Sequence, residues 1–178
     1  MTMSHTKLLW IMICSLALLA RCATTSAVAQ GSTVVFVVRH AEKLDPADGN
    51  SPISPAGEER AQELANTLGK SHVQRIYATS KLRTQQTVAP LAKKLGIEPV
   101  ILEPGATGEL VGRIKTDAED KVVLVCGHSN TVPDIVKALS GIAVDGIPEE
   151  RFDRLFKLTI PADGKATVEE MRYGAPTP

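Results

Sequence analysis

Apolar residues are grouped along the chain in a way that predicts alternating strands and helices. The two most apolar runs, residues 33–38 and 121–126, are rich in valine and have almost no polar position. This pattern is typical of strands that are covered on both sides of a sheet. Shorter apolar runs at residues 75–78 and 99–102 predict two further strands.

Four segments carry apolar residues at helical spacing. These apolar positions lie within residues 61–68, 88–95, 110–114 and 133–139. Ser54 followed by Pro55 predicts the start of the first helix, because serine caps a helix N-terminus and proline suits the first turn. Gly69 and Gly96 predict where the first and second helices end.

The order of these elements predicts the fold class. Strands that alternate with helices favour a three-layer α/β/α sandwich around a mostly parallel central sheet. Near the end of the chain, residues 155–160 and 166–172 flank Asp163-Gly164, which predicts an antiparallel hairpin added to that sheet. The chain has 178 residues, and we expect residues 30–178 to form a single domain.

Residues 1–29 have the features of a secretory signal peptide. Lys7 precedes an apolar stretch too short to span a bilayer, and residues 27–29 match a cleavage site. Lipidation at Cys22 is the alternative, but Arg21 stands where lipoprotein signals carry a small residue. We therefore expect cleavage after residue 29 and a periplasmic or secreted protein, with no membrane span in the mature chain.

Charge and cysteine content narrow the classes of function. The chain has 20 basic and 20 acidic residues, and removal of residues 1–29 would leave 18 and 20, a net charge of −2. Such a chain lacks the general attraction of basic proteins to nucleic acid or anionic lipid, so we expect no nucleic-acid partner. Of three cysteines only Cys126 would remain, which excludes an intramolecular disulfide in the mature chain.

Arginine and histidine side chains follow three of the predicted strands. Arg39 and His40 come after the first, Arg83 just after the second, and His128 after the strand that ends at Cys126. Because ligands bind beyond the carboxyl ends of parallel strands, we expect these four side chains to converge. Arginine matches phosphate with a planar fork of donors, and histidine can act as a nucleophile near neutral pH. The set favours phosphoryl transfer through a phosphohistidine, and no metal-ligand spacing accompanies it.

Four ordered motifs make the sequence resemble the histidine phosphatase superfamily, the phosphoglycerate mutase-like enzymes. Residues 37–42 (VVRHAE) resemble its Arg-His-Gly-Glu motif, and residues 53–57 (ISPAG) its Leu-Ser-x-x-Gly element. Residues 79–87 (TSKLRTQQT) resemble the helix that carries the second arginine, and residues 125–129 (VCGHS) the strand end with the second histidine. The resemblance spans residues 33–173, nearly the whole predicted mature chain.

The resemblance implies a role for each of the four converging residues. His40 would be the phosphorylated nucleophile, while Arg39, Arg83 and His128 would form the phosphate pocket. No metal ion or other cofactor would be required. The implied fold is the same α/β sandwich that the pattern of elements predicts.

The general acid is left open between three glutamates. Ser129 stands where one branch of the family carries an aspartate as its acid. The other branch uses a glutamate downstream of the second arginine, for which Glu103 and Glu109 are candidates, and Glu42 is a third. An alkoxide leaving group needs such a proton, which is worth about 10²–10⁴-fold in rate. A phosphoramidate or acyl phosphate needs it less.

The sequence therefore predicts an exported, metal-independent phosphatase of the histidine acid phosphatase type. Its substrates would be small phosphorylated molecules or envelope components, hydrolysed through phospho-His40. One alternative is a phosphohistidine protein phosphatase, because small family members of that kind are similar in size and also sparing in acids. Another is a phosphate-ligand-binding protein without turnover. A mutase is disfavoured because the connections are too short for a large cap, and a serine hydrolase because no histidine follows Ser129.

Overall fold

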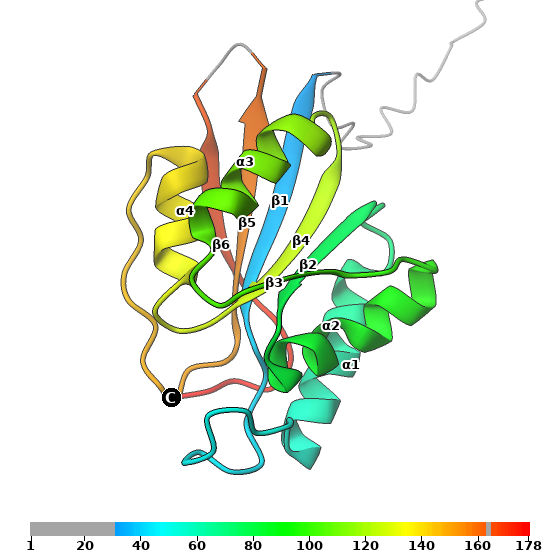
Figure 1. Ribbon diagram of the computed structural model, residues 1–178, viewed down its shortest axis with the longest axis vertical. Helices are drawn as coiled ribbons and strands as arrows, with labels where there is room; N and C mark the ends of the chain where they lie inside the picture. The colour runs from blue at the N-terminus through cyan, green and yellow to red at the C-terminus, as the bar shows by residue number, and fades with distance from the viewer. Residues whose placement is uncertain (1–30, 163–164) are drawn as a thin grey trace, which may run out of the picture.

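A single six-stranded sheet organises the molecule, and the computed structural model describes residues 31–162 and 165–178 (Figure 1). The predicted signal peptide and the Asp163-Gly164 turn lie outside the described residues. In chain order the strands are β1 (Ser32–Arg39), β2 (Arg75–Thr79), β3 (Val100–Leu102), β4 (Val122–Gly127), β5 (Arg154–Pro161) and β6 (Thr167–Arg172). Their order across the sheet is β3-β2-β4-β1-β5-β6.

The sheet is mixed, as the sequence predicts. β3, β2, β4 and β1 run parallel to one another. β5 pairs antiparallel with β1, and β6 pairs antiparallel with β5. The predicted antiparallel pair at the end of the chain is therefore confirmed as an addition to a parallel sheet.

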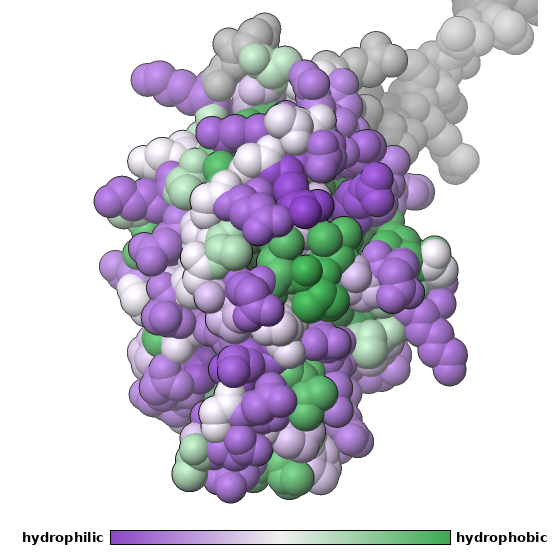
Figure 2. Space-filling model, viewed as in Figure 1, coloured by the Kyte–Doolittle hydropathy of each residue, from purple (hydrophilic) through white to green (hydrophobic). Residues whose placement is uncertain are grey.

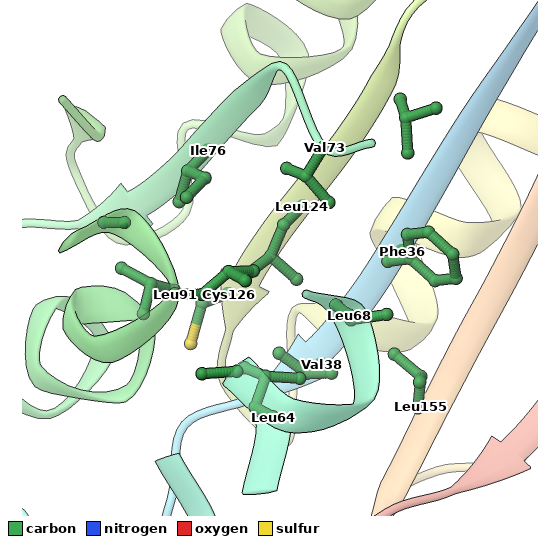
Figure 3. Packing of buried hydrophobic residues seen from close by; sticks show 14 of the residues in the cluster. Phe36, Val38, Leu64, Leu68, Val73, Ile76, Leu91, Leu124, Cys126 and Leu155 are labelled. Carbon is green, nitrogen blue, oxygen red and sulfur yellow. The ribbon is translucent and has the colours of Figure 1, made fainter. Parts of the chain in front are cut away.

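Two helices cover each face of the sheet, which confirms the three-layer sandwich (Figure 1). The helices are α1 (Pro55–Leu68), α2 (Leu82–Leu95), α3 (Thr107–Asp117) and α4 (Val132–Ser140). α1 and α2 pack on one face, where Leu64, Leu68 and Leu91 lie over Phe36 and Cys126 (Figure 3). α3 and α4 pack on the other face. Burial of both faces is the reason that β1 and β4 read as continuous apolar runs.

The helix ends follow the sequence signals in all but one respect. Ser54 caps α1, since its hydroxyl accepts a hydrogen bond from the backbone N–H of Gly57 at 3.1 Å. Gly96 ends α2 in the left-handed conformation. Gly69 follows α1 but stays right-handed, and the left-handed residue is His72 with φ 57°. Glycine is favoured at position 69 because there is no room for a side chain: a Cβ there would lie 2.7 Å from the carbonyl oxygen of Ala65.

The carboxyl ends of the parallel strands bring the candidate residues to one edge of the sheet. Arg39 ends β1 and pairs in register with Gly127, the last residue of β4. The segment that follows β1 packs closely against the first turn of α1. A Cβ on Gly57 would lie 2.6 Å from the carbonyl oxygen of Glu42, so only glycine fits there. This contact fixes the segment that follows His40.

The surface is mostly polar, with apolar side chains gathered over β2 and β3 below α3 (Figure 2). Ile101 on the edge strand β3 is among the exposed large apolar residues of the described chain. Among residues 31–162 and 165–178, no helix is long and apolar enough to cross a membrane.

Candidate active site

Arg39, His40, Arg83 and His128 meet at the carboxyl edge of the sheet, as the sequence predicts. The imidazole rings of His40 and His128 lie edge to face with their centroids 5.5 Å apart. Arg83, in the first turn of α2, donates from Nη2 to Nδ1 of His128 at 3.2 Å. Arg39, His40 and His128 are buried. The structure therefore places two imidazoles and two guanidinium groups in one largely desolvated cluster.

One hydrogen bond determines which nitrogen of His40 carries a lone pair. Nδ1 lies 2.7 Å from the backbone carbonyl of Ala41. A carbonyl oxygen only accepts, so Nδ1 must hold the proton. In the neutral ring Nε2 is then unprotonated, which is the form required of a nucleophile. The backbone N–H of Ala41 donates to Thr87 Oγ1 at 2.9 Å, and this bond anchors the peptide that orients the ring.

His128 is held in the opposite tautomer. Its Nδ1 accepts from the Arg83 guanidinium, which can only donate. The proton must therefore lie on Nε2, which donates to Thr79 Oγ1 at 3.0 Å. Thr79 ends β2 and its hydroxyl also lies 2.9 Å from that of Thr84 on α2. His128 is thus fixed at both ring nitrogens.

The guanidinium of Arg39 is clamped by the segment between α4 and β5. Nη1 donates to the carbonyl oxygens of Pro148, Glu149 and Arg151 at 2.8, 2.7 and 3.1 Å. Nη2 donates to Glu149 Oε2 at 2.7 Å. The Phe152 ring covers the group, with its centroid 4.2 Å from Cζ. Arg39 is therefore rigidly positioned before any ligand arrives.

Both arginines keep one N–H without an acceptor. The Nε atoms of Arg39 and Arg83 are buried and have no hydrogen-bond partner among the described residues. A buried donor without a partner costs about 1–3 kcal/mol, and binding of a ligand is one way in which such a group gains its acceptor. Unmatched guanidinium donors are suited to an oxyanion, which offers acceptors in the planar geometry that arginine matches. Arg151 Nε and Tyr173 Oη are also buried without a partner among the described residues.

Burial and neighbouring cations keep both imidazoles neutral. Burial, followed by the charges of Arg39 and Arg83, lowers the pKa of His40 from 6.5 to about 3. The same causes, with Arg83 the stronger charge, lower the pKa of His128 to about 4. Burial also lowers the pKa of Arg83. Near neutral pH the site therefore holds two positive guanidinium groups and two uncharged rings.

These pKa values predict how the free protein responds to acid. The native imidazoles of His40 and His128 should show no titration between pH 8 and pH 5 in histidine NMR spectra. In the unfolded chain each ring would take up a proton below about pH 6.5, whereas in the folded protein it stays neutral. Protonation therefore lowers the free energy of unfolding as the pH falls from 6.5 toward the folded-state pKa values, by up to about 1.4 kcal/mol per pH unit for each ring.

Thermal unfolding at pH 7 and pH 5 checks the stability effect. The midpoint should be lower at pH 5, and by less in the His40→Asn variant, which has one ring fewer to protonate. Titration of both buried rings near pH 6.5 would contradict this prediction.

None of the three glutamates considered as general acid is hydrogen-bonded to the four central residues. Glu42 forms a salt bridge at 2.7 Å with buried Arg60, which also binds the C-terminal carbonyl oxygens of Tyr173 and Ala175. Its contacts are those of a residue that ties the segment after His40 to the end of the chain.

The other two glutamates lie farther along the chain, at and beyond the end of β3. Glu103 accepts from Ser80 at 3.1 Å near the carboxyl edge. Glu109 pairs with Arg113 on the exposed side of α3. Of these two, the structure places Glu103 at the edge of the sheet that holds the histidines and Glu109 away from it.

Three residues of the site are missing from the prediction made from sequence. Thr79 binds His128, Phe152 covers Arg39, and Glu149 bonds both Arg39 and Ser129. Thr79 has a sequence signal, because it ends a strand and is the first residue of the motif that carries the second arginine. Glu149 and Phe152 lie in an irregular segment without periodicity, so no sequence signal locates them.

Comparisons with known proteins agree with this arrangement. A model of the histidine phosphatase superfamily (branch 1) matches residues 35–106, which include Arg39, His40 and Arg83. The PE-PGRS family protein PE_PGRS11 of Mycobacterium tuberculosis (strain ATCC 25618 / H37Rv) is 37% identical over 82 residues. That match covers 42% of this chain and 14% of the relative, so the chain corresponds to a small part of that protein.

Solved structures with the same fold belong to several phosphatases and hydrolases. The protein histidine phosphatase SixA complexed with tungstate has a TM-score of 0.63 at 22% identity, covering 78% of this chain and 96% of its own. Mycobacterial hydrolase 2 has a TM-score of 0.66 at 12% identity, and the match covers 82% of this chain and 93% of the hydrolase. Mycobacterial glucosyl-3-phosphoglycerate phosphatase Rv2419c has a TM-score of 0.61 at 13% identity, and the match covers 80% of this chain and 100% of that phosphatase. These structures show that the chain has the fold of such phosphatases. The matched model identifies residues 35–106 as similar to the histidine phosphatase superfamily (branch 1).

Proposed function

We propose that the protein is a phosphatase that transfers a phosphoryl group to Nε2 of His40 and then to water. The observation that carries this proposal is the clustering of His40, whose Nε2 is unprotonated, with His128 and with the charged groups of Arg39 and Arg83. A nucleophile and oxyanion donors in one largely desolvated cluster are the elements that phosphoryl transfer needs.

The reaction divides into two balanced steps. The lone pair of His40 Nε2 forms a bond to phosphorus as the bond to the leaving oxygen breaks, and that oxygen takes up one proton. Water then forms a new P–O bond, the N–P bond breaks, and inorganic phosphate and one proton are released. Arg39 and Arg83 would neutralise the charge on the equatorial oxygens in both steps.

We further propose that the protein acts after export, on small phosphomonoesters or phosphorylated envelope components. This part of the proposal rests on the signal-like residues 1–29. A phosphohistidine protein phosphatase is the second candidate. It is favoured by one observation: Glu42, Glu103 and Glu109 make no hydrogen bond to the central residues. A phosphoramidate has a leaving group that depends less on a general acid.

The test is phosphate release by the purified protein from aryl, sugar, acyl and phosphoramidate substrates in the presence of EDTA. The proposal predicts turnover that requires His40. Turnover of phosphoramidate alone would favour the second candidate. Binding of phosphate compounds without turnover of any substrate would overturn the proposal and leave a phosphate-binding protein.

A further inference from the structure

The carboxylate of Glu149 is tied into the proposed phosphate site at both of its oxygens. Oε2 accepts from Arg39 Nη2 at 2.7 Å, and Oε1 accepts from Ser129 Oγ at 2.5 Å. Arg39 ends β1, and Ser129 follows His128 just beyond neighbouring β4. The carboxylate therefore bridges the ends of the two strands that present His40 and His128.

This carboxylate is not needed to hold its own segment in place. The backbone carbonyls of Pro148, Glu149 and Arg151 already bind Arg39 Nη1. The side chain of Glu149 is also 76% exposed, so it adds little to the buried packing. Its removal would leave the three carbonyl contacts intact, and its main contribution is a negative charge at a fixed place.

That charge is present under ordinary conditions. The hydrogen bond from Ser129, together with the charge of Arg39, lowers the pKa of Glu149. The residue is thus ionised at neutral pH, which makes it a poor proton donor there. It remains in contact with solvent, so a ligand entering the site from outside would meet an anion beside Arg39.

An anion at this position discriminates between ligands by the charge that they carry beyond the phosphoryl group. The phosphoryl group itself is attracted by Arg39 and Arg83 and would use their Nε donors. A second negative group on the ligand, held near the opening, would be repelled by Glu149, while a positive group would be attracted. Interactions of this kind tune selectivity more than overall affinity.

We propose that Glu149 is a specificity-determining residue that selects, by charge, monoesters whose leaving group is neutral or cationic over those whose leaving group bears a second anion. This inference rests on the proposed phosphatase function, and it extends that function to a substrate class. Glu149 would act through electrostatics at the opening and not through proton transfer.

The test compares three alkyl phosphates of equal chain length that end in an ammonium, a hydroxyl or a carboxylate group. The full-length protein should rank them in that order by kcat/KM. In Glu149→Gln, kcat/KM for the carboxylate compound should rise by about fivefold and that for the ammonium compound should fall by about as much, since an exposed charge is partly screened. The hydroxyl compound should stay within about twofold.

Glu150→Gln is the matched control. Glu150 is adjacent and exposed, and its charge acts on Arg39 less strongly than that of Glu149. This variant should keep the wild-type ranking. High salt should compress the ranking of the three compounds in the wild type, because screening weakens discrimination by charge.

A binding measurement separates this inference from the proposed function. The dissociation constants of the three compounds are measured by calorimetry in the His40→Ala variant with and without Glu149→Gln, so turnover is not needed. A shift in the ranking there would support the role of Glu149 even if no substrate were hydrolysed. Equal changes for all three compounds would overturn it. So would a loss of activity that grows with the basicity of the leaving group, which is the mark of a general acid.

Discussion

The His40→Ala variant should release phosphate at least about a thousandfold more slowly than the wild-type protein, because removal of a nucleophile abolishes the covalent route. The residual arginine pocket can still bind the phosphoryl group, so KM or inhibition by inorganic phosphate should change far less than kcat. Steady-state phosphate release measures both quantities.

His72→Asn is the matched control for this variant. His72 is exposed and has a positive φ of 57°, a conformation that asparagine tolerates better than alanine. It should retain wild-type kcat. Activity of His40→Ala close to that of His72→Asn would rule out His40 as the nucleophile.

The Arg39→Lys variant should lose activity by about a hundredfold or more although it keeps the positive charge, since an ammonium group lacks the planar fork of donors. The change also leaves some of the three carbonyl oxygens bound by Nη1 without a donor. The free energy of unfolding should therefore fall by about 1–3 kcal/mol. Phosphate release and denaturant unfolding measure the two effects.

Arg75→Lys supplies the comparison, because Arg75 lies exposed at the start of β2, at the opposite end of that strand from the site. Arg75→Lys should change neither the rate of phosphate release nor the free energy of unfolding. Wild-type kcat/KM in Arg39→Lys would show that charge alone suffices and that the fork geometry is not used. Such a result would weaken the assignment of Arg39 to the phosphate pocket.

The fold could be predicted from the sequence because burial leaves a clear pattern in its central elements. β1 and β4 are covered by helices on both faces, and each reads as an unbroken apolar run. The boundary of α1 could be predicted because Ser54 forms a local cap. Gly69 is a different case: its role depends on close contact with the carbonyl of Ala65 and not on a left-handed turn.

The four central residues could be predicted because strand ends converge in a parallel sheet. Arg39, His40 and His128 lie at or beside strand ends, so topology brings them together. Arg83 follows β2 in the first turn of α2. Their hydrogen-bonded tautomers could not be predicted, because the partners of His40 and His128 are a carbonyl and a threonine hydroxyl fixed by the folded backbone.

The general acid is the part of the site that could least be predicted from the sequence. Glu42 adjoins the nucleophile motif, yet it pairs with Arg60, a residue of α1 that also holds the C-terminal segment. Glu149 lies far from every motif, yet it contacts Arg39 and Ser129. Both outcomes depend on long-range pairing between charged side chains, which leaves no local pattern in a sequence.

The most direct test of phosphoryl transfer through His40 is to trap the intermediate. The protein is mixed with an aryl phosphate, quenched rapidly under alkaline conditions that preserve phosphohistidine, and analysed by mass spectrometry. We predict a mass gain of one phosphoryl group, located on the peptide that contains His40 and missing from the His40→Ala variant. Rapid turnover with a phosphoryl group on another residue, or with none on the protein during steady state, would contradict the account.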